Sequence, residues 1–192
     1  MKVCVFAASS SRVDRTYSEE ASKLGILLAE AGIEVIYGGG GSGLMGRLAD
    51  SVLEKGGKIT GVIPEFMRAE GWGHTEITEV IITRDMGERK KWMFENSDSV
   101  IALPGGIGTL EELTEAITLK QLGLYSGPVI ILNTLNYYRS FLDFLEQMIS
   151  GQFLRIEHKG IWEVVATPGE AIKALTGYTG WMEDPKRIAR IF

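Results

Sequence analysis

Short apolar runs alternate along this chain with longer segments of helical periodicity. The pattern predicts strands at Val3–Ala7, Glu34–Tyr37, Lys58–Ile63, Glu79–Thr83, Ser99–Leu103, Pro128–Leu132 and Trp162–Val165. It predicts helices at Thr16–Ala31, Leu44–Lys55, Met86–Asn96, Thr109–Leu122, Tyr137–Ile149 and Glu170–Leu175, and leaves residues 65–78 irregular. We therefore expect an α/β fold: a Rossmann-like, doubly wound parallel sheet of about six or seven strands with helices on both faces.

The length of 192 residues fits a single domain spanning residues 1–192. Its end, from about residue 180 to 192, is expected to form a packed tail or an oligomer contact through Trp181 and Phe192. In sheets of this type, ligands bind beyond the carboxyl ends of the strands, where the strand order reverses. The loops after the first, second, fourth and fifth strands are therefore the candidates for a site.

The charge and the cysteine content limit which partners and which cellular compartment we expect. With 20 basic against 25 acidic residues, the formal net charge is −5, which argues against extended binding to nucleic acid or anionic membranes. The one cysteine, Cys4, lies in an apolar run and is expected to be buried, which fits a reducing cytoplasm. The apolar run near the N-terminus is too short for a signal peptide, so we expect a soluble cytoplasmic protein. His74 and His158 lack ligand spacing, and we expect no metal and no cofactor.

Glycine clusters mark two of the expected strand-to-helix turns. The first contains Gly41-Ser-Gly43-Leu-Met-Gly46, a G-x-G-x-x-G pattern, and Glu65 follows about twenty residues later, where a ribose-binding acid would stand. A dinucleotide-dependent oxidoreductase is one hypothesis that this pattern supports. However, the pattern follows the second expected strand rather than the first. Glycines that only permit a tight turn and close helix packing explain it equally well.

The second cluster, Pro104-Gly-Gly-Ile-Gly-Thr109, leaves a buried strand and enters a helix. Its glycines let the backbone approach a ligand, and the free N–H groups at the helix N-terminus favour an anion. The sequence therefore predicts a phosphate cradle. Thr109 is expected to cap the helix or to donate its hydroxyl to phosphate. The loop is not a Walker A motif, because no Lys-Ser/Thr pair follows it.

Two glutamates follow that loop. Glu112 is expected about one turn inside the helix, within reach of a sugar attached to the bound phosphate, where a carboxylate can act on an anomeric carbon. Glu111 is more simply explained as a first-turn glutamate that the helix dipole favours. Arg89, in a row with Lys90 and Lys91, is by itself most simply explained as a solvated helix charge.

Pro104-Gly-Gly-Ile-Gly-Thr-Leu-Glu-Glu112 resembles the P-G-G-x-G-T-x-x-E signature of the LOG family, the cytokinin riboside 5′-monophosphate phosphoribohydrolases formerly labelled possible lysine decarboxylases. Further similarities occur in the same order along the chain. They are Tyr37-Gly-Gly-Gly40 with Gly43-Leu-Met-Gly46, Gly61-Val-Ile-Pro64, Glu88-Arg89-Lys90 with Met93, Gln121-Leu-Gly123, Leu132-Asn133 and Tyr137-Tyr138. The chain departs from the family pattern at Ala8, at Gly87 and in the segment Thr118-Leu119-Lys120. The departures at Ala8 and Gly87 bear on which base is preferred.

The resemblance implies an N-glycosyl hydrolase acting on an adenosine 5′-monophosphate, with or without an N6 substituent, to release the free base and ribose 5-phosphate. It implies catalytic roles for Arg89 and Glu112, and a homodimer with sites near the subunit interface. The substrate-binding residues that it implies are Ser9, Gly43, Met86, Lys90, Gly105, Gly106, Ile107, Gly108, Thr109, Leu110, Glu111 and Thr118. The alternative is a non-catalytic carrier of a nucleotide or of the molybdenum cofactor, built on a similar nucleotide-binding domain.

Overall fold

The computed structural model describes residues 1–181. Seven strands are present: β1 (Lys2–Phe6), β2 (Glu34–Tyr37), β3 (Ile59–Pro64), β4 (Glu79–Thr83), β5 (Ser99–Ala102), β6 (Val129–Leu132) and β7 (Trp162–Val165). Seven α-helices accompany them: α1 (Arg15–Glu30), α2 (Gly43–Glu54), α3 (Glu65–Ala69), α4 (Met86–Glu95), α5 (Ile107–Gln121), α6 (Arg139–Ser150) and α7 (Pro168–Gly177). Two short 3₁₀ helices, Thr134–Asn136 and Ile156–Gly160, precede α6 and β7.

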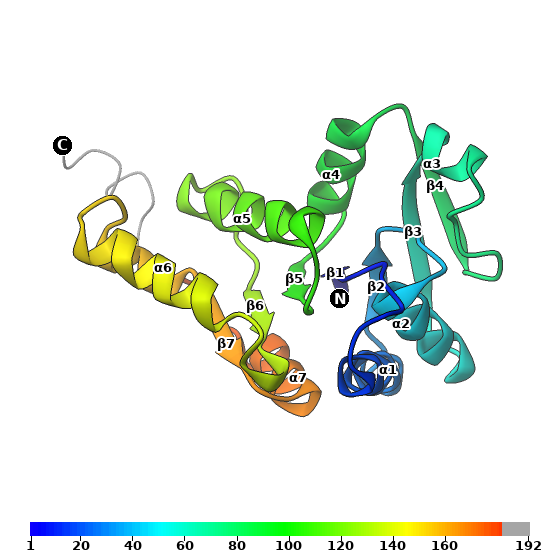
Figure 1. The fold of residues 1–192 in the computed structure, drawn as a ribbon, viewed down its shortest axis with the longest axis horizontal. Helices are drawn as coiled ribbons and strands as arrows, with labels where there is room; N and C mark the ends of the chain where they lie inside the picture. Colours follow the sequence, from blue (N-terminus) through cyan, green and yellow to red (C-terminus); the bar gives the residue numbers. More distant parts are fainter. Residues whose placement is uncertain (182–192) are drawn as a thin grey trace.

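All seven strands form one sheet in the order β4-β3-β2-β1-β5-β6-β7, and every pairing is parallel. The predicted doubly wound parallel sheet is confirmed. The chain moves outward from β1 to β4 on one side, then crosses back to place β5 on the other side of β1 (Figure 1). The strand order therefore reverses between β1 and β5, and the loops after these strands diverge there.

Helices cover both faces of the sheet, as Figure 1 shows. On one face, Leu24 and Leu28 of α1 and Leu44 and Leu48 of α2 are completely buried against alternate strand residues such as Val5. On the other face, α4, α5 and α6 pack over the strand residues of opposite orientation. That second cluster includes Cys4, Phe6, Met93, Leu113, Ala116 and Tyr138. Cys4 is fully buried, as predicted.

The structure differs from the predicted elements at a few boundaries. Residues 65–69, expected to be irregular, form helix α3, because Pro64 takes an extended N-cap conformation and Glu65 fits the first helical turn, where the helix dipole favours a carboxylate. Helix α5 begins at Ile107 rather than Thr109, with Gly106 as its N-cap and no side-chain cap. The interpretation of Thr109 as the cap is therefore wrong. The prediction for the C-terminal tail lies outside the described residues from residue 182 onward, but Trp181 is described and packs beside His158.

Within residues 1–181, no helix is both long enough and apolar enough to span a bilayer.

Candidate active site

Two adjoining cavities lie at the carboxyl ends of the central strands. The inner cavity, of about 290 Å³, is lined by the loop after β1, by the N-terminal part of α5 and by α4. The outer cavity, of about 590 Å³, is lined by the β2–α2 loop, the end of β3 and residues 71–73. The two cavities share the lining residues Ser9, Gly38, Met45, Met67 and Arg89, so they form one cleft. The cleft lies at the edge of the sheet that the strand pattern predicted for a ligand.

The inner cavity opens onto the N-terminus of α5. Gly106, Gly108 and Thr109 line it, and Thr109 is only 5% exposed. The N–H groups of the first helical turn have no partner inside the helix and carry the positive end of its dipole. Position 105 requires glycine, because a Cβ there would overlap the Thr109 side chain. The arrangement places free helix N–H groups and the Thr109 side chain around one cavity, which is the donor set that an anion cradle needs.

Two tyrosine hydroxyls and neighbouring backbone hold the loop before α5 in place. The Tyr138 hydroxyl donates to the Leu103 carbonyl at 2.7 Å, and the Tyr137 hydroxyl donates to the carbonyl of Gly105. The loop after β1 is fixed from both sides, since Ala8 N–H donates to Pro104 O at 3.3 Å and Ala8 O accepts from Met45 N–H at 3.2 Å. A preorganised loop binds an anion without the cost of ordering it first.

Arg89 reaches the cleft from α4, which Asp85 caps by accepting from the Glu88 N–H at 2.8 Å. The Arg89 side chain is 8% exposed, so its interpretation as a solvated charge is wrong. Its Nε donates to the Val62 carbonyl at 2.9 Å and its Nη1 to Glu112 Oε1 at 2.9 Å. Nη2 faces Gly38, where no side chain intervenes. Two of the three guanidinium nitrogens thus hold the group in place, and the third, Nη2, faces Gly38 in the lining of the cleft.

Glu112 completes the pair from α5. It is 7% exposed and lines the inner cavity together with Arg89. Burial raises the pKa of the Glu112 carboxyl, and the adjacent Arg89 guanidinium opposes that rise. The result is a desolvated carboxyl group that lines the inner cavity and is held by one charged hydrogen bond from Arg89.

A second charged cluster joins the same two helices outside the cavities. Lys90 forms ion pairs with Glu111 and with Glu115, the latter at 2.7 Å. The interpretation of Glu111 as a dipole-favoured first-turn residue is wrong, because it lies beyond the first turn of α5 and is engaged with Lys90. These pairs tie α4 to α5 beside Arg89 and Glu112.

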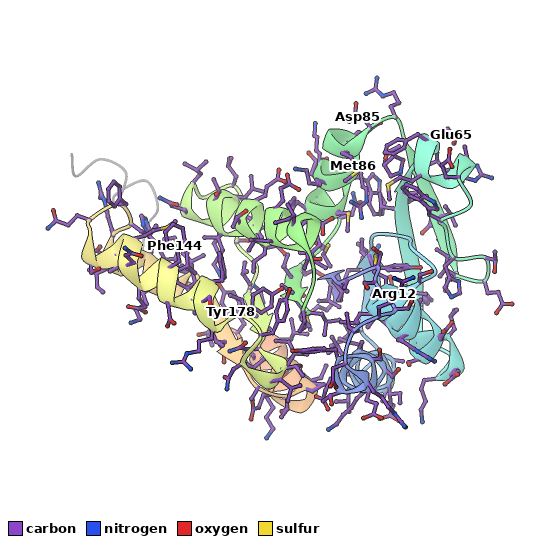
Figure 2. All side chains as sticks on the ribbon, in the orientation of Figure 1. Arg12, Glu65, Asp85, Met86, Phe144 and Tyr178 are labelled. Carbon is purple, nitrogen blue, oxygen red and sulfur yellow. The ribbon has the colours of Figure 1, made fainter. Side chains whose placement is uncertain are left out.

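Two glycines of the first cluster, Gly43 and Gly46, are required for close packing, whereas Gly41 lines the outer cavity. A Cβ at Gly43 would overlap the backbone of Ser9 and Ser10, and a Cβ at Gly46 would overlap the carbonyl of Gly41. Close packing of α2 on the loops explains the G-x-G-x-x-G pattern. Glu65 stands on α3 (Figure 2), with its nearest cation, Arg68, at 4.0 Å, and it lines neither cavity.

The predicted site residues divide into three groups. Ser9, Met86, Arg89, Gly106, Gly108, Thr109 and Glu112 line the inner cavity. Gly105 lies just behind it, beside a small cavity of about 240 Å³ next to Tyr137. Gly43, Lys90, Ile107, Leu110, Glu111 and Thr118 line neither main cavity. The period of α5 explains this division, because residues 108, 109 and 112 share one face, whereas Thr118 is exposed and bonds back to Thr114 O.

Several lining residues were absent from the predicted set: Gly38, Met45, Ile63, Met67 and Trp72. Gly38 carried a signal in the Tyr37-Gly-Gly-Gly40 run. Met67 and Trp72 carried none, because they belong to the stretch without recognisable periodicity. Among the described residues, no group of three or more His, Cys, Asp or Glu side chains is arranged to hold a metal ion.

A protein-family model and known relatives match most of this chain. A family model described as "Possible lysine decarboxylase" matches residues 45–175. The chain is 40% identical over 179 residues to the probable cytokinin riboside 5′-monophosphate phosphoribohydrolase LOGL6 of Oryza sativa subsp. japonica, covering 93% of this chain and 71% of the relative. It is 42% identical over 180 residues to the cytokinin riboside 5′-monophosphate phosphoribohydrolase LOG7 of Arabidopsis thaliana, covering 92% and 82%.

Solved structures share the fold. A molybdenum cofactor binding protein from Rippkaea orientalis superposes with a TM-score of 0.69 at 20% identity, covering 92% of this chain and 95% of that one. The X-ray structure of a protein named TM1055 superposes with the same score of 0.69 at 28% identity, covering 92% and 99%. The first of these likenesses is one of fold alone, since its sequence identity is low.

Proposed function

The chain belongs to the LOG family of cytokinin riboside 5′-monophosphate phosphoribohydrolases, the family described as possible lysine decarboxylase, and from this premise we propose how its cleft works. It is an N-glycosyl hydrolase that cleaves the bond between base and ribose in an adenosine 5′-monophosphate derivative. The free base and ribose 5-phosphate are the products. The observation that carries the proposal is the buried Arg89–Glu112 pair beside the anion cradle.

The phosphate binds at the N-terminus of α5. Backbone N–H groups at Gly106, Gly108 and Thr109, with the Thr109 hydroxyl, bind its oxygens. This contact is remote from the bond that breaks, so its binding energy positions the ribose rather than stabilising the leaving group. Ser9 and Met86 line the same cavity and complete its walls.

Glu112 acts at the anomeric carbon. Departure of the base leaves an oxocarbenium-like ribose, whose positive charge the Glu112 carboxylate stabilises. The base departs with the electron pair of the C1′–N bond, and water adds to C1′ so that a C–O bond replaces the C–N bond. Glu112 accepts the proton that this water loses and passes it on to the departed base, which restores the carboxylate. Arg89 fixes Glu112 through Nη1 and presents Nη2 to the ribose. These catalytic roles are proposed for Arg89 and Glu112 alone.

The other residues that the family pattern implied act less directly. Lys90 and Glu111 orient α4 against α5. Gly43 and Gly105 permit close packing, and Ile107, Leu110 and Thr118 reach substrate only across a subunit contact. We propose a single nucleotide-binding domain that forms a cytoplasmic homodimer, in keeping with the 82% exposed side chain of Ile107 at the rim of the cradle. The molar mass from light scattering tests the dimer.

Two other activities are less well supported. A carrier would use the cradle only to bind, but the carrier structures share the fold at about 20% identity, whereas the phosphoribohydrolases share 40% of the sequence. A decarboxylase that uses a Schiff base needs a lysine in its site. No lysine lines either of the two cavities in the part of the chain that is described.

Product analysis tests the proposal. Purified protein is incubated with AMP and with isopentenyl-AMP, and free base and ribose 5-phosphate are measured. Wild-type protein should release both products from at least one nucleotide. Glu112→Gln should lower kcat by roughly 100-fold or more while AMP binding is largely kept, because the shape of the site is preserved and its charge is lost.

Glu111→Gln is the matched control, since it changes the neighbouring carboxylate, which lines neither cavity. It should retain far more activity than Glu112→Gln. A Glu112→Gln protein with near-wild-type turnover would remove Glu112 from the mechanism. Binding of AMP by the wild type without any release of base would favour the carrier.

A further inference from the structure

The outer cavity extends the cleft well beyond the catalytic pair. Its volume, about 590 Å³, exceeds the 290 Å³ of the inner cavity that holds Glu112. Side chains of Met45, Ile63, Met67 and Trp72 line it, and Arg89 is the one ionisable group among its lining residues, all of which are described. The side of the cavity formed by Met45, Ile63, Met67 and Trp72 takes an apolar ligand group, whereas Ser9, Ser42 and Arg89 supply polar groups elsewhere in the lining.

The wall formed by residues 71–74 is fixed by its backbone. Gly41 N–H donates to Trp72 O at 3.1 Å, and His74 N–H donates to Gly39 O at 2.9 Å. The His74 ring bonds Asp50 of α2 at 3.0 Å, which fastens the segment to the body of the protein. Trp72 N–H donates to Met67 O at 3.3 Å, so Trp72 is also tied to α3.

The Trp72 side chain is not used by the core. Although its backbone is held at both sides, the side chain is 55% exposed and contributes to the cavity wall. Large aromatic side chains that stay exposed on a fixed backbone are typical of binding surfaces, because they offer contact area with little loss of entropy.

The direction of the cleft places this wall at the base end of a nucleotide. The lining of the cleft comes from loops that follow four strands. The glycine loop before α5 follows β5, and Ser9, which lines both cavities, follows β1. Gly38 follows β2 and Met67 follows β3. These four strands are consecutive in the sheet. Three strand spacings correspond to roughly 14 Å. A nucleotide with its phosphate on α5 and its anomeric carbon at Glu112 therefore directs its base toward Met67 and Trp72.

We propose that Trp72, supported by Met67, is a specificity-determining residue that selects an apolar N6 substituent on the base. The proposal rests on the proposed function, since it places the ribose at Glu112. The substituent lies against the indole and the Met67 side chain and displaces water from the outer cavity. Substrates with such a group gain contact that plain AMP lacks, so the ratio of kcat/KM for isopentenyl-AMP to that for AMP depends on Trp72.

The test compares this ratio in four proteins: wild type, Trp72→Ala, Trp72→Phe and Phe66→Ala. Phe66 is the matched control, because it lies beside Met67 on α3, is 54% exposed and lines neither cavity. Trp72→Ala should lower the ratio about tenfold, a change of the size that one or two apolar contacts produce. Trp72→Phe should retain most of the wild-type ratio, and Phe66→Ala should leave the ratio at the wild-type value.

Equal losses for both nucleotides in Trp72→Ala, or no loss for either, would overturn the proposal. Binding of the two nucleotides to Glu112→Gln and to Glu112→Gln with Trp72→Ala is measured in parallel. If wild-type protein cleaves neither nucleotide, the proposed hydrolysis fails. The proposal for Trp72 then depends on binding alone. It also fails unless Trp72→Ala weakens the binding of isopentenyl-AMP about tenfold more than the binding of AMP.

Discussion

Arg89 and Glu112 are two opposite charges that the fold removes almost completely from water. The desolvation of each charge is offset by the other and by the Val62 carbonyl, which takes the Arg89 Nε. A buried pair of this kind contributes little net stability, whereas loss of one partner leaves an uncompensated charge. The pair is therefore better explained by chemistry at the cleft than by a contribution to folding.

The pH dependence of kcat reports on Glu112 directly. Because burial raises the pKa of Glu112, protonation begins at a higher pH than for an ordinary glutamate. The carboxylate must be charged to stabilise the oxocarbenium state, so activity is lost as the pH falls through that raised pKa. We expect the acid limb of kcat to lie above about pH 4.3, the ordinary glutamate pKa. A profile of kcat against pH in a constant-ionic-strength buffer measures it.

Glu111→Gln supplies the control for this profile. The Glu111 charge helps to raise the pKa of Glu112, so its removal should move the acid limb toward lower pH. An acid limb at or below the ordinary glutamate range would contradict the expectation. A movement of the acid limb to higher pH in Glu111→Gln would contradict the expectation as well.

At the scale of elements, the site depends on how closely the β2–α2 loop passes α4. A Cβ at Gly38 would overlap Arg89 Nη2 and would lie 3.2 Å from Met45 Sδ. Gly38→Ala should therefore displace the guanidinium from Glu112. A misplacement of about 1 Å costs on the order of 100-fold in rate. We expect a fall of that order in kcat with a modest drop in Tm, measured by steady-state kinetics and thermal unfolding.

Gly169→Ala is the matched control for Gly38→Ala. Gly169 lies in the first turn of α7, and a Cβ there would meet nothing within 4 Å. Its kcat should equal that of the wild type. A Gly38→Ala protein with unchanged kcat would show that Arg89 can move without loss of function.

The elements were largely predictable from the sequence, but the closeness of their approach was not. Hydrophobic periodicity located every strand and most helices, since the inner strands of the parallel sheet are buried on both faces and form nearly continuous apolar runs. It missed α3, whose five residues are too few to show a period. Motif position indicated Gly106, Thr109 and Glu112. By contrast, the burial of Arg89 and the wall formed by Trp72 depend on contacts between loops that are distant in sequence.

At the scale of the whole molecule, the cleft joins the two halves of the sheet. Its lining comes from the loops after β1, β2 and β3 on one side of the switch point and after β5 on the other. A ligand that contacts both halves binds the folded state and not the unfolded chain. It therefore stabilises the whole molecule by RT ln(1 + [L]/Kd).

This linkage separates a mononucleotide site from a dinucleotide site. AMP at about 100 times its Kd contributes about 2.7 kcal/mol, which corresponds to a rise in Tm of roughly 5–10 °C for a chain of this size. Glu112→Gln protein is used so that AMP is not consumed. NAD should give no rise, because the Gly43 and Gly46 backbone that would cradle its pyrophosphate is packed against Ser9, Ser10 and Gly41. Protection by NAD without protection by AMP would instead assign the cleft to a dinucleotide-dependent oxidoreductase.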